Sequence, residues 1–206
     1  MKSVDVIVNG SRKWDIRVKD ERFWRMFVSA GVIGFVDAYQ NGYFECDDLC
    51  ELCYRLTKMD LNKYSIFHPY YYFNCDLEYY FGIQNSDSAY KDGGEGYDKY
   101  NDYIEKYMGI NYSCPNMNQI VKYTEKLFVV EDWQNYGNHM AIASQQIYEK
   151  NKKLKIVLMK EFGEKMFNVW QIVFAISYAL YRTRQSHVWQ IIFSKSGIEG
   201  GYDSEH

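Results

Sequence analysis

The sequence predicts an α+β fold: one domain with an N-terminal β-hairpin and a small mixed or antiparallel sheet packed against about five helices. Three observations lead to this prediction. Apolar residues alternate on both sides of an Asn9-Gly10 turn, several segments repeat apolar residues with helical spacing, and 47% of the 206 residues are hydrophobic, enough for one core. We expect residues 1–196 to form this domain and residues 197–206 to be a flexible tail.

Local signals define the elements expected near the N-terminus. Residues 4–8 and 13–18 alternate between apolar and polar side chains, which is typical of the two strands of a hairpin. Asp20 is a suitable helix N-cap and Gly31 a suitable stop, so a helix is expected over residues 21–30.

The remaining elements follow from apolar runs and spacing. The run at 31–39 predicts a buried strand, and a helix is expected over 45–59. The segment 169–174 recurs in similar form at 188–193, which we interpret as two core elements of similar local design. We also expect strands at 64–81, a loop at 84–96, helices at 97–108, 117–127 and 137–151, a strand at 154–159 and a buried helix or strand at 166–181.

Charge and tyrosine are distributed unevenly along the chain. Residues 64–112 contain twelve tyrosines and eight acidic residues against three lysines, a net charge of −5. Residues 151–196 contain eight basic residues against two acidic ones, a net charge of +6. Tyrosine is enriched in binding surfaces because it offers a rigid amphipathic side chain at low entropic cost. The acidic, tyrosine-rich segment therefore indicates a surface for interaction.

From this segment we predict a protein-binding inhibitor, of the anti-defence, immunity or antitoxin type. Its carboxylates would dock on the basic surface of a protein partner, such as a nuclease or toxin, and its tyrosines would supply buried contacts. No cofactor is expected, and no catalytic residues are assigned. The predicted partner-binding residues are Tyr97, Asp98, Tyr100, Asp102, Tyr103 and Glu105.

Three cysteines provide an alternative that is an enzyme. The spacing Cys46-x3-Cys50-x2-Cys53, with a Gly93-Gly94-Glu95 motif 40 residues downstream of the last cysteine, resembles the radical S-adenosylmethionine enzymes. That resemblance implies an iron–sulfur cluster held by the three thiolates and a cofactor held at Gly93–Glu95. The same cysteines also fit the buried face of a helix, and we favour this interpretation because free cysteine is among the most buried residue types.

The basic C-terminal third offers a second alternative, a regulatory protein that binds nucleic acid. Its basic residues, with nearby tryptophans, suit phosphate contacts and stacking. The overall charge of −3 makes a nucleic-acid partner the less favoured interpretation. An odd number of cysteines and no N-terminal apolar leader predict a cytoplasmic protein. We expect no membrane partner, and a homodimer is compatible with the tyrosine-rich surface.

Overall fold

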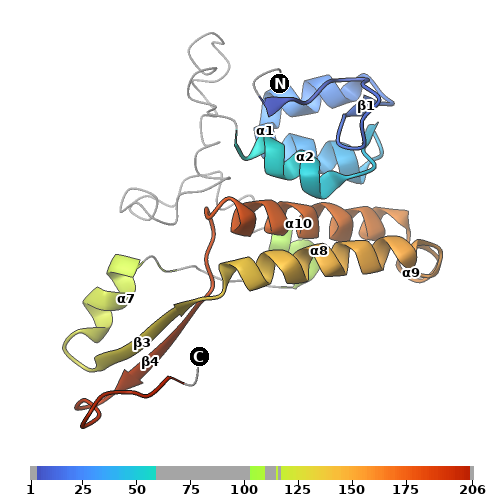
Figure 1. The fold of residues 1–206 in the computed structure, drawn as a ribbon. Coiled ribbons are helices and arrows are strands. Elements are labelled where there is room, and N and C mark those ends of the chain that lie inside the picture. The colour runs from blue at the N-terminus through green and yellow to red at the C-terminus, as the bar shows by residue number, and fades with distance from the viewer. Residues whose placement is uncertain (1–3, 59–102, 110–114, 116, 205–206) are drawn as a thin grey trace.

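The computed structural model describes residues 4–58, 103–109, 115 and 117–204, except the side chains of 28–33. A pair of long helices, α8 (Gly137–Lys153) and α10 (Glu164–Arg182), forms the centre of this part of the chain (Figure 1). The short helix α9 (Lys155–Phe162) joins them at one end. At the other end the strands β3 (Val129–Asn135) and β4 (Trp189–Ser194) project as a two-stranded arm.

The N-terminal part forms a second layer on this helix pair. It contains α1 (Arg22–Gln40), α2 (Leu49–Leu56) and a small sheet in which β1 (Arg17–Val18) pairs antiparallel with β2 (Phe44–Glu45). Helix α10 packs against α8, α2, α9 and α1, so it lies at the centre of the packing.

The two segments of the predicted N-terminal hairpin lie together but do not pair as hairpin strands do. Asn9 has a positive φ of 56°, and its amide donates to the carbonyl of Ile16 at 2.6 Å. The two segments share a single isolated bridge, Val8 to Ile16, and this bridge is parallel, whereas the strands of a hairpin are antiparallel. The second segment instead continues as β1 and pairs with β2, which comes after α1 in the chain.

The strand predicted at 31–39 is wrong, because α1 continues through it without a break. A buried helix can present a continuous apolar run that looks like a buried strand. Gly31 costs some helix stability but does not end the helix. The helix ends at Asn41-Gly42, where Gly42 has a φ of +71° and its amide donates to the carbonyl of Tyr39 at 2.9 Å.

The strand predicted at 154–159 is also wrong, because Leu154 precedes α9 and residues 155–159 form its start. The Leu154 amide donates to the carbonyl of Lys150 at 3.1 Å, so the helical hydrogen-bonding pattern of α8 continues into the connection. No residue of α9 is buried, so this apolar run is a surface helix and not a core strand.

The recurring hexapeptide adopts two different structures. Residues 169–174 lie within α10, while the similar residues 188–193 begin one residue before β4 and continue along it. Local sequence therefore does not decide the structure of this motif. Packing against α8 and α2 favours the helix, and pairing with β3 favours the strand.

Several predictions are confirmed. Helix α2 is capped by Asp48, whose carboxylate accepts from the Glu51 amide at 3.0 Å. Helix α8 and α7 (Met117–Thr124) lie within one to three residues of the predicted bounds. The predicted segment 64–81, the loop at 84–96 and residues 97–102 lie outside the described residues, whereas 103–108 are helical.

Together these elements confirm the α+β class: helices combined with two small antiparallel sheets. Within the described ranges, no helix is both long enough and apolar enough to cross a membrane. At the C-terminal end, the Ile198 amide donates to a Glu131 carboxylate oxygen at 3.0 Å, which ties the first residues of the predicted tail to β3.

Candidate functional site

Two chain connections meet where the β3/β4 arm joins the helix pair, and we call this region the junction (residues 132–137 and 183–190). Strand β3 passes into α8 through Tyr136, and α10 passes into β4 through residues 183–188. The Tyr136 amide donates to the carbonyl of Val188 at 2.7 Å. Segments about fifty residues apart are thereby held against each other, in the region where polar and aromatic side chains are concentrated.

Asn135 links the two segments through its side chain. Its Oδ1 accepts from the Gly137 amide at 2.9 Å, which satisfies a free N–H in the first turn of α8. Because Oδ1 is used in this way, Nδ2 faces His187 and lies 2.9 Å from the ring Nδ1. An amide nitrogen is a donor, so Nδ1 accepts and the ring hydrogen is on Nε2.

His187 is held as a neutral ring. Partial burial, and then the positive charge of Arg184, lower its pKa below the ordinary value. The ring stacks on Trp189 with 5.6 Å between centroids and 9° between planes. Among the residues that the structure describes, none accepts a hydrogen bond from Nε2. His187 is therefore an oriented hydrogen-bond donor at neutral pH.

A second set of hydrogen bonds runs along the other face of β3. The Tyr136 hydroxyl donates to Gln134 Oε1 at 2.6 Å, and Gln134 Nε2 donates to Asp132 Oδ2 at 2.7 Å. Side chains two residues apart share a face of an extended strand, which brings these three together. This set fixes the rotamers of Gln134 and Tyr136 beside the start of α8.

Aromatic rings complete the junction. Trp133 meets Trp189 edge to face at 5.4 Å between centroids, so Trp189 lies between Trp133 and His187. The Trp133 Nε1 atom is buried and has no hydrogen-bond partner in the part of the chain that the structure describes. An unsatisfied buried donor is costly unless a ligand completes it. The junction thus combines donors (Trp133, His187 and the Arg184 guanidinium) with apolar ring faces, and suits a ligand that carries oxygen acceptors next to apolar groups.

The predicted partner-binding surface is described only in part. Tyr97, Asp98, Tyr100 and Asp102 lie outside the described residues. Tyr103 is 7% exposed, packs 4.7 Å from the Tyr107 ring and belongs to the hydrophobic core. Burial raises the pKa of its hydroxyl. Glu105 is exposed on the same helical segment.

The structure favours the interpretation of the three cysteines as core residues over the interpretation as cluster ligands. Cys50 and Cys53 are buried on α2, and Cys46 precedes the helix with its Sγ donating to the carbonyl of Lys13 at 3.3 Å. Burial raises the pKa of the Cys46 thiol to about 12 and raises the pKa of the other two as well. Cluster ligation requires thiolates, which this environment disfavours. Within the described ranges, no three His, Cys, Asp or Glu side chains are grouped as metal ligands, and Gly93–Glu95 lie outside those ranges.

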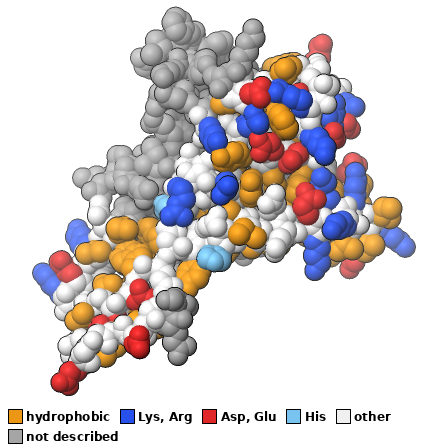
Figure 2. Space-filling view, in the orientation of Figure 1, with side chains coloured by type: hydrophobic (Ala, Val, Ile, Leu, Met, Phe, Trp, Pro, Cys, Tyr) orange, Lys and Arg blue, Asp and Glu red, His pale blue; other side chains and the backbone are white. Residues whose placement is uncertain are grey.

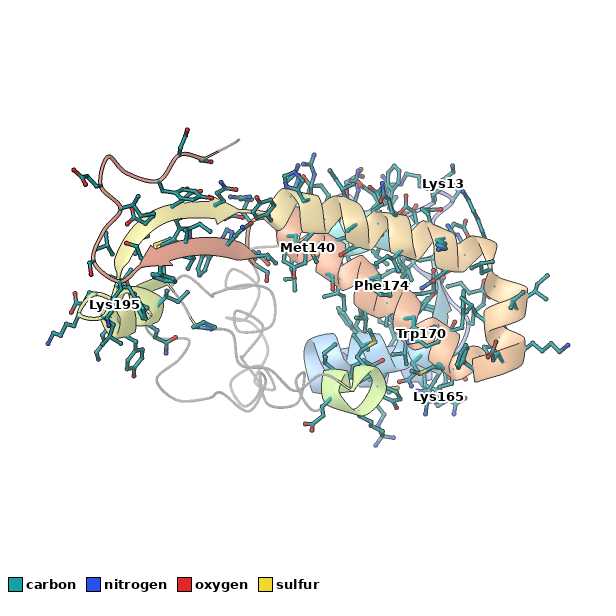
Figure 3. The ribbon with its side chains drawn as sticks, turned by 90° about the horizontal axis from the view of Figure 1, so that it is seen from below. Lys13, Met140, Lys165, Trp170, Phe174 and Lys195 are labelled. Carbon is teal, nitrogen blue, oxygen red and sulfur yellow. The ribbon has the colours of Figure 1, made fainter. Side chains whose placement is uncertain are left out.

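The basic residues of the C-terminal third do not form one surface. Figure 3 shows Lys165 at the end of α10 that packs near α1, whereas Lys195 lies at the far end of the arm. Arg182 and Arg184 lie between them, Arg184 within the junction and Arg182 at the end of α10 beside it. Such a division does not provide the continuous basic groove that nucleic acid requires.

Comparison with curated proteins finds partial similarity to one kind of enzyme, while no family model matches the chain. The chain is 27% identical over 99 residues to the cyclopropane-fatty-acyl-phospholipid synthases of Escherichia coli strains K12 and O6:H1, covering 48% of this chain and 26% of each relative. It is 28% identical over 88 residues to the cyclopropane-fatty-acyl-phospholipid synthase of Citrobacter freundii, covering 41% of this chain and 94% of that sequence. The chain therefore spans about a quarter of the length of the Escherichia coli relatives it matches.

These matches correct the functional prediction. The inhibitor, immunity and anti-defence interpretations are wrong, because the proteins that resemble this chain are lipid-modifying enzymes. Sequence reasoning also missed the junction. The signal that could have found it is the run Glu131–Gly137, in which polar and aromatic residues precede a helix and include Asn135, a residue type that accepts a hydrogen bond from the backbone two residues on.

Proposed function

We propose that this chain acts on acyl phospholipids as an enzyme of the cyclopropane-fatty-acyl-phospholipid synthase class, a methyltransferase-like activity. The observation that carries this proposal is the partial identity to three synthases of that name. Because the chain spans only a fraction of the Escherichia coli relatives, the activity and the substrate are both parts of the proposal.

The junction supports the proposal through its chemistry. A phospholipid presents ester and phosphate oxygens next to apolar acyl chains. The oriented donor His187, the unpaired indole N–H of Trp133 and the cationic Arg184 suit those oxygens, while the ring of Trp189 suits the apolar part. We assign His187 the role of binding and orienting the substrate, because its Nδ1 is already occupied by Asn135.

A cytoplasmic location is also part of the proposal. Cys46, Cys50 and Cys53 are free thiols, as expected in a reducing compartment. In that location the substrate would be reached from the cytoplasmic side of a bilayer.

The test is formation of cyclopropane acyl chains in a bacterial strain that lacks its own synthase. The full chain is expressed, lipids are extracted, and gas chromatography with mass spectrometry detects acyl chains that have gained one methylene group. We expect such chains with the native sequence and at least about tenfold fewer with His187→Phe, which keeps an aromatic ring but removes the donor.

The matched control is His139→Phe, since His139 lies exposed in the first turn of α8 and its ring contacts Tyr136 at 5.4 Å between centroids. Its product level should equal that of the native chain. Folded native protein that yields no cyclopropane acyl chains would reject the proposed activity. Equal loss from both histidine variants would reject the role of His187.

A further inference from the structure

An apolar, lysine-rich surface lies at the end of the molecule where α9 connects α8 to α10. Four of its apolar side chains are exposed: Leu154 by 41%, Ile156 by 85%, Val157 by 58% and Phe162 by 51%. Figure 2 shows hydrophobic side chains interleaved with basic ones at this end. We call residues 150–165 the α9 surface. It lies at the opposite end of the helix pair from the junction (Figure 1).

The charge of the α9 surface is strongly positive. Six lysines stand there against two glutamates, Glu161 and Glu164. Lys153 and Lys160 are exposed and have no ion-pair partner among the described residues. Lys152 is partly engaged, since its Nζ donates to the carbonyl of Asp47 at 2.9 Å. Exposed apolar residues surrounded by lysines mark an interaction site, and this combination suits a partner that is anionic and partly apolar.

A second exposed apolar surface, on α7 and the start of β3, has a different charge. Val121 is 41% exposed and Leu127 is 62% exposed. Between residues 117 and 131, two lysines are balanced by two glutamates. Exposure alone therefore does not distinguish the two surfaces. The excess of positive charge is specific to the α9 surface, and it selects an anionic partner.

We propose that the α9 surface docks on an anionic phospholipid bilayer, with Ile156, Val157 and Phe162 inserted at the level of the headgroups and the lysines contacting lipid phosphates. Helices that lie in the interface combine these two features, and no spanning segment is needed. This inference rests on the proposed function for the choice of lipid as the partner. It departs from the sequence-based expectation of no membrane partner, which considered only spanning segments.

The experiment is sedimentation of the full chain with vesicles. Vesicles of phosphatidylcholine alone are compared with vesicles that contain phosphatidylglycerol, at low and high salt. We expect binding only to the anionic vesicles, weakened at high salt because screening shortens the reach of exposed charges. Lys153→Glu combined with Lys160→Glu should weaken binding by at least about tenfold, and Ile156→Ser combined with Val157→Ser by a similar factor.

The matched control is Val121→Ser combined with Leu127→Ser on the second apolar surface, which should bind as the native chain does. Circular dichroism confirms that each variant is folded, and all the substituted side chains are exposed. Equal loss in the control, or binding unaffected by both α9 pairs, overturns the proposal. Association of the chain with itself through α9, without vesicle binding, also overturns it.

Failure of this inference is distinguishable from failure of the proposed function. Cyclopropane acyl chains formed in cells by a protein that does not bind anionic vesicles would reject only the docking surface. Vesicle binding that depends on α9, by a protein that forms no cyclopropane acyl chains, would reject only the enzymatic proposal.

Discussion

Replacing Asp15 with asparagine should destabilise the N-terminal layer in a way that depends on pH. The Asp15 side chain is fully buried. Its carboxylate accepts from the Ile7 amide at 2.9 Å, from the Arg12 amide at 3.0 Å, and from the Arg12 guanidinium at 2.9 and 3.1 Å. Gly10 packs so closely that a Cβ there would lie 2.2 Å from Asp15 Oδ2. This carboxylate thus holds the N-terminal turn together.

The magnitude follows from the pKa of Asp15. Hydrogen bonds from Arg12 lower this pKa to about 2, while an unfolded aspartate titrates near 3.9. The difference corresponds to roughly 2.5 kcal/mol of stability. Because the folded pKa is the lower one, this stability is present above about pH 4 and is lost as the pH falls toward about 2. Asp15→Asn removes it at neutral pH and leaves Arg12 with one carboxylate fewer.

Urea unfolding of both proteins between pH 7 and pH 2 measures the effect. The variant should be less stable by roughly 2–3 kcal/mol at pH 7, and the two curves should converge as the pH approaches 2. Asp47→Asn is the control, because Asp47 forms an exposed ion pair with Arg17 and should cost less than about 1 kcal/mol. A difference that stays constant across this pH range would refute the reasoning, since it would not come from ionisation of Asp15.

Two further predictions concern the junction and α2. Arg184→Asn should raise the pKa of His187 toward its ordinary value, because a nearby positive charge is removed, and asparagine tolerates the φ of 63° at this position. An NMR titration of the imidazole ring measures this shift, and an unchanged pKa would contradict the electrostatic assignment. Cys53→Ser should cost roughly 1–3 kcal/mol in urea unfolding, because it places a hydroxyl in a site that is 1% exposed. Cys46→Ser should be nearly neutral, since a serine hydroxyl can also donate to the Lys13 carbonyl, and equal costs would argue against the core interpretation.

Local signals in the sequence predicted the elements that have clear ends. Asp48 caps α2, and the apolar stripe of this helix is buried as its spacing indicates. The failures at 31–39 and 154–159 share a cause. An apolar run shows that a segment is hydrophobic. Over six to nine residues, however, the spacing of its apolar residues fits both a helix and a strand, and only packing decides between them.

The junction could not be predicted for a different reason. It depends on pairing between β3 and β4. Three helices separate these strands in the chain, and nothing in either strand's sequence indicates that the other is its partner. His187 precedes a strand and Asn135 ends one, so neither is marked as a partner of the other. Only the antiparallel register, with Asn135 opposite Trp189, brings the amide to the imidazole.

If the junction binds the lipid substrate and the α9 surface docks on a bilayer, as we propose, the two together constrain how the protein can lie on that bilayer. They are at opposite ends of α8, which has 17 residues and is therefore roughly 25 Å long. If the helix pair stood upright on α9, lipid would have to rise by that distance to reach His187. An orientation with α8 along the surface avoids this cost. Met140, Ile147 and Leu154 recur every seven residues on one side of α8 and its end, and each is 37–41% exposed. This stripe extends from the α9 surface to the junction end, where Figure 3 places Met140, so it is the side of α8 that we expect to face the lipid.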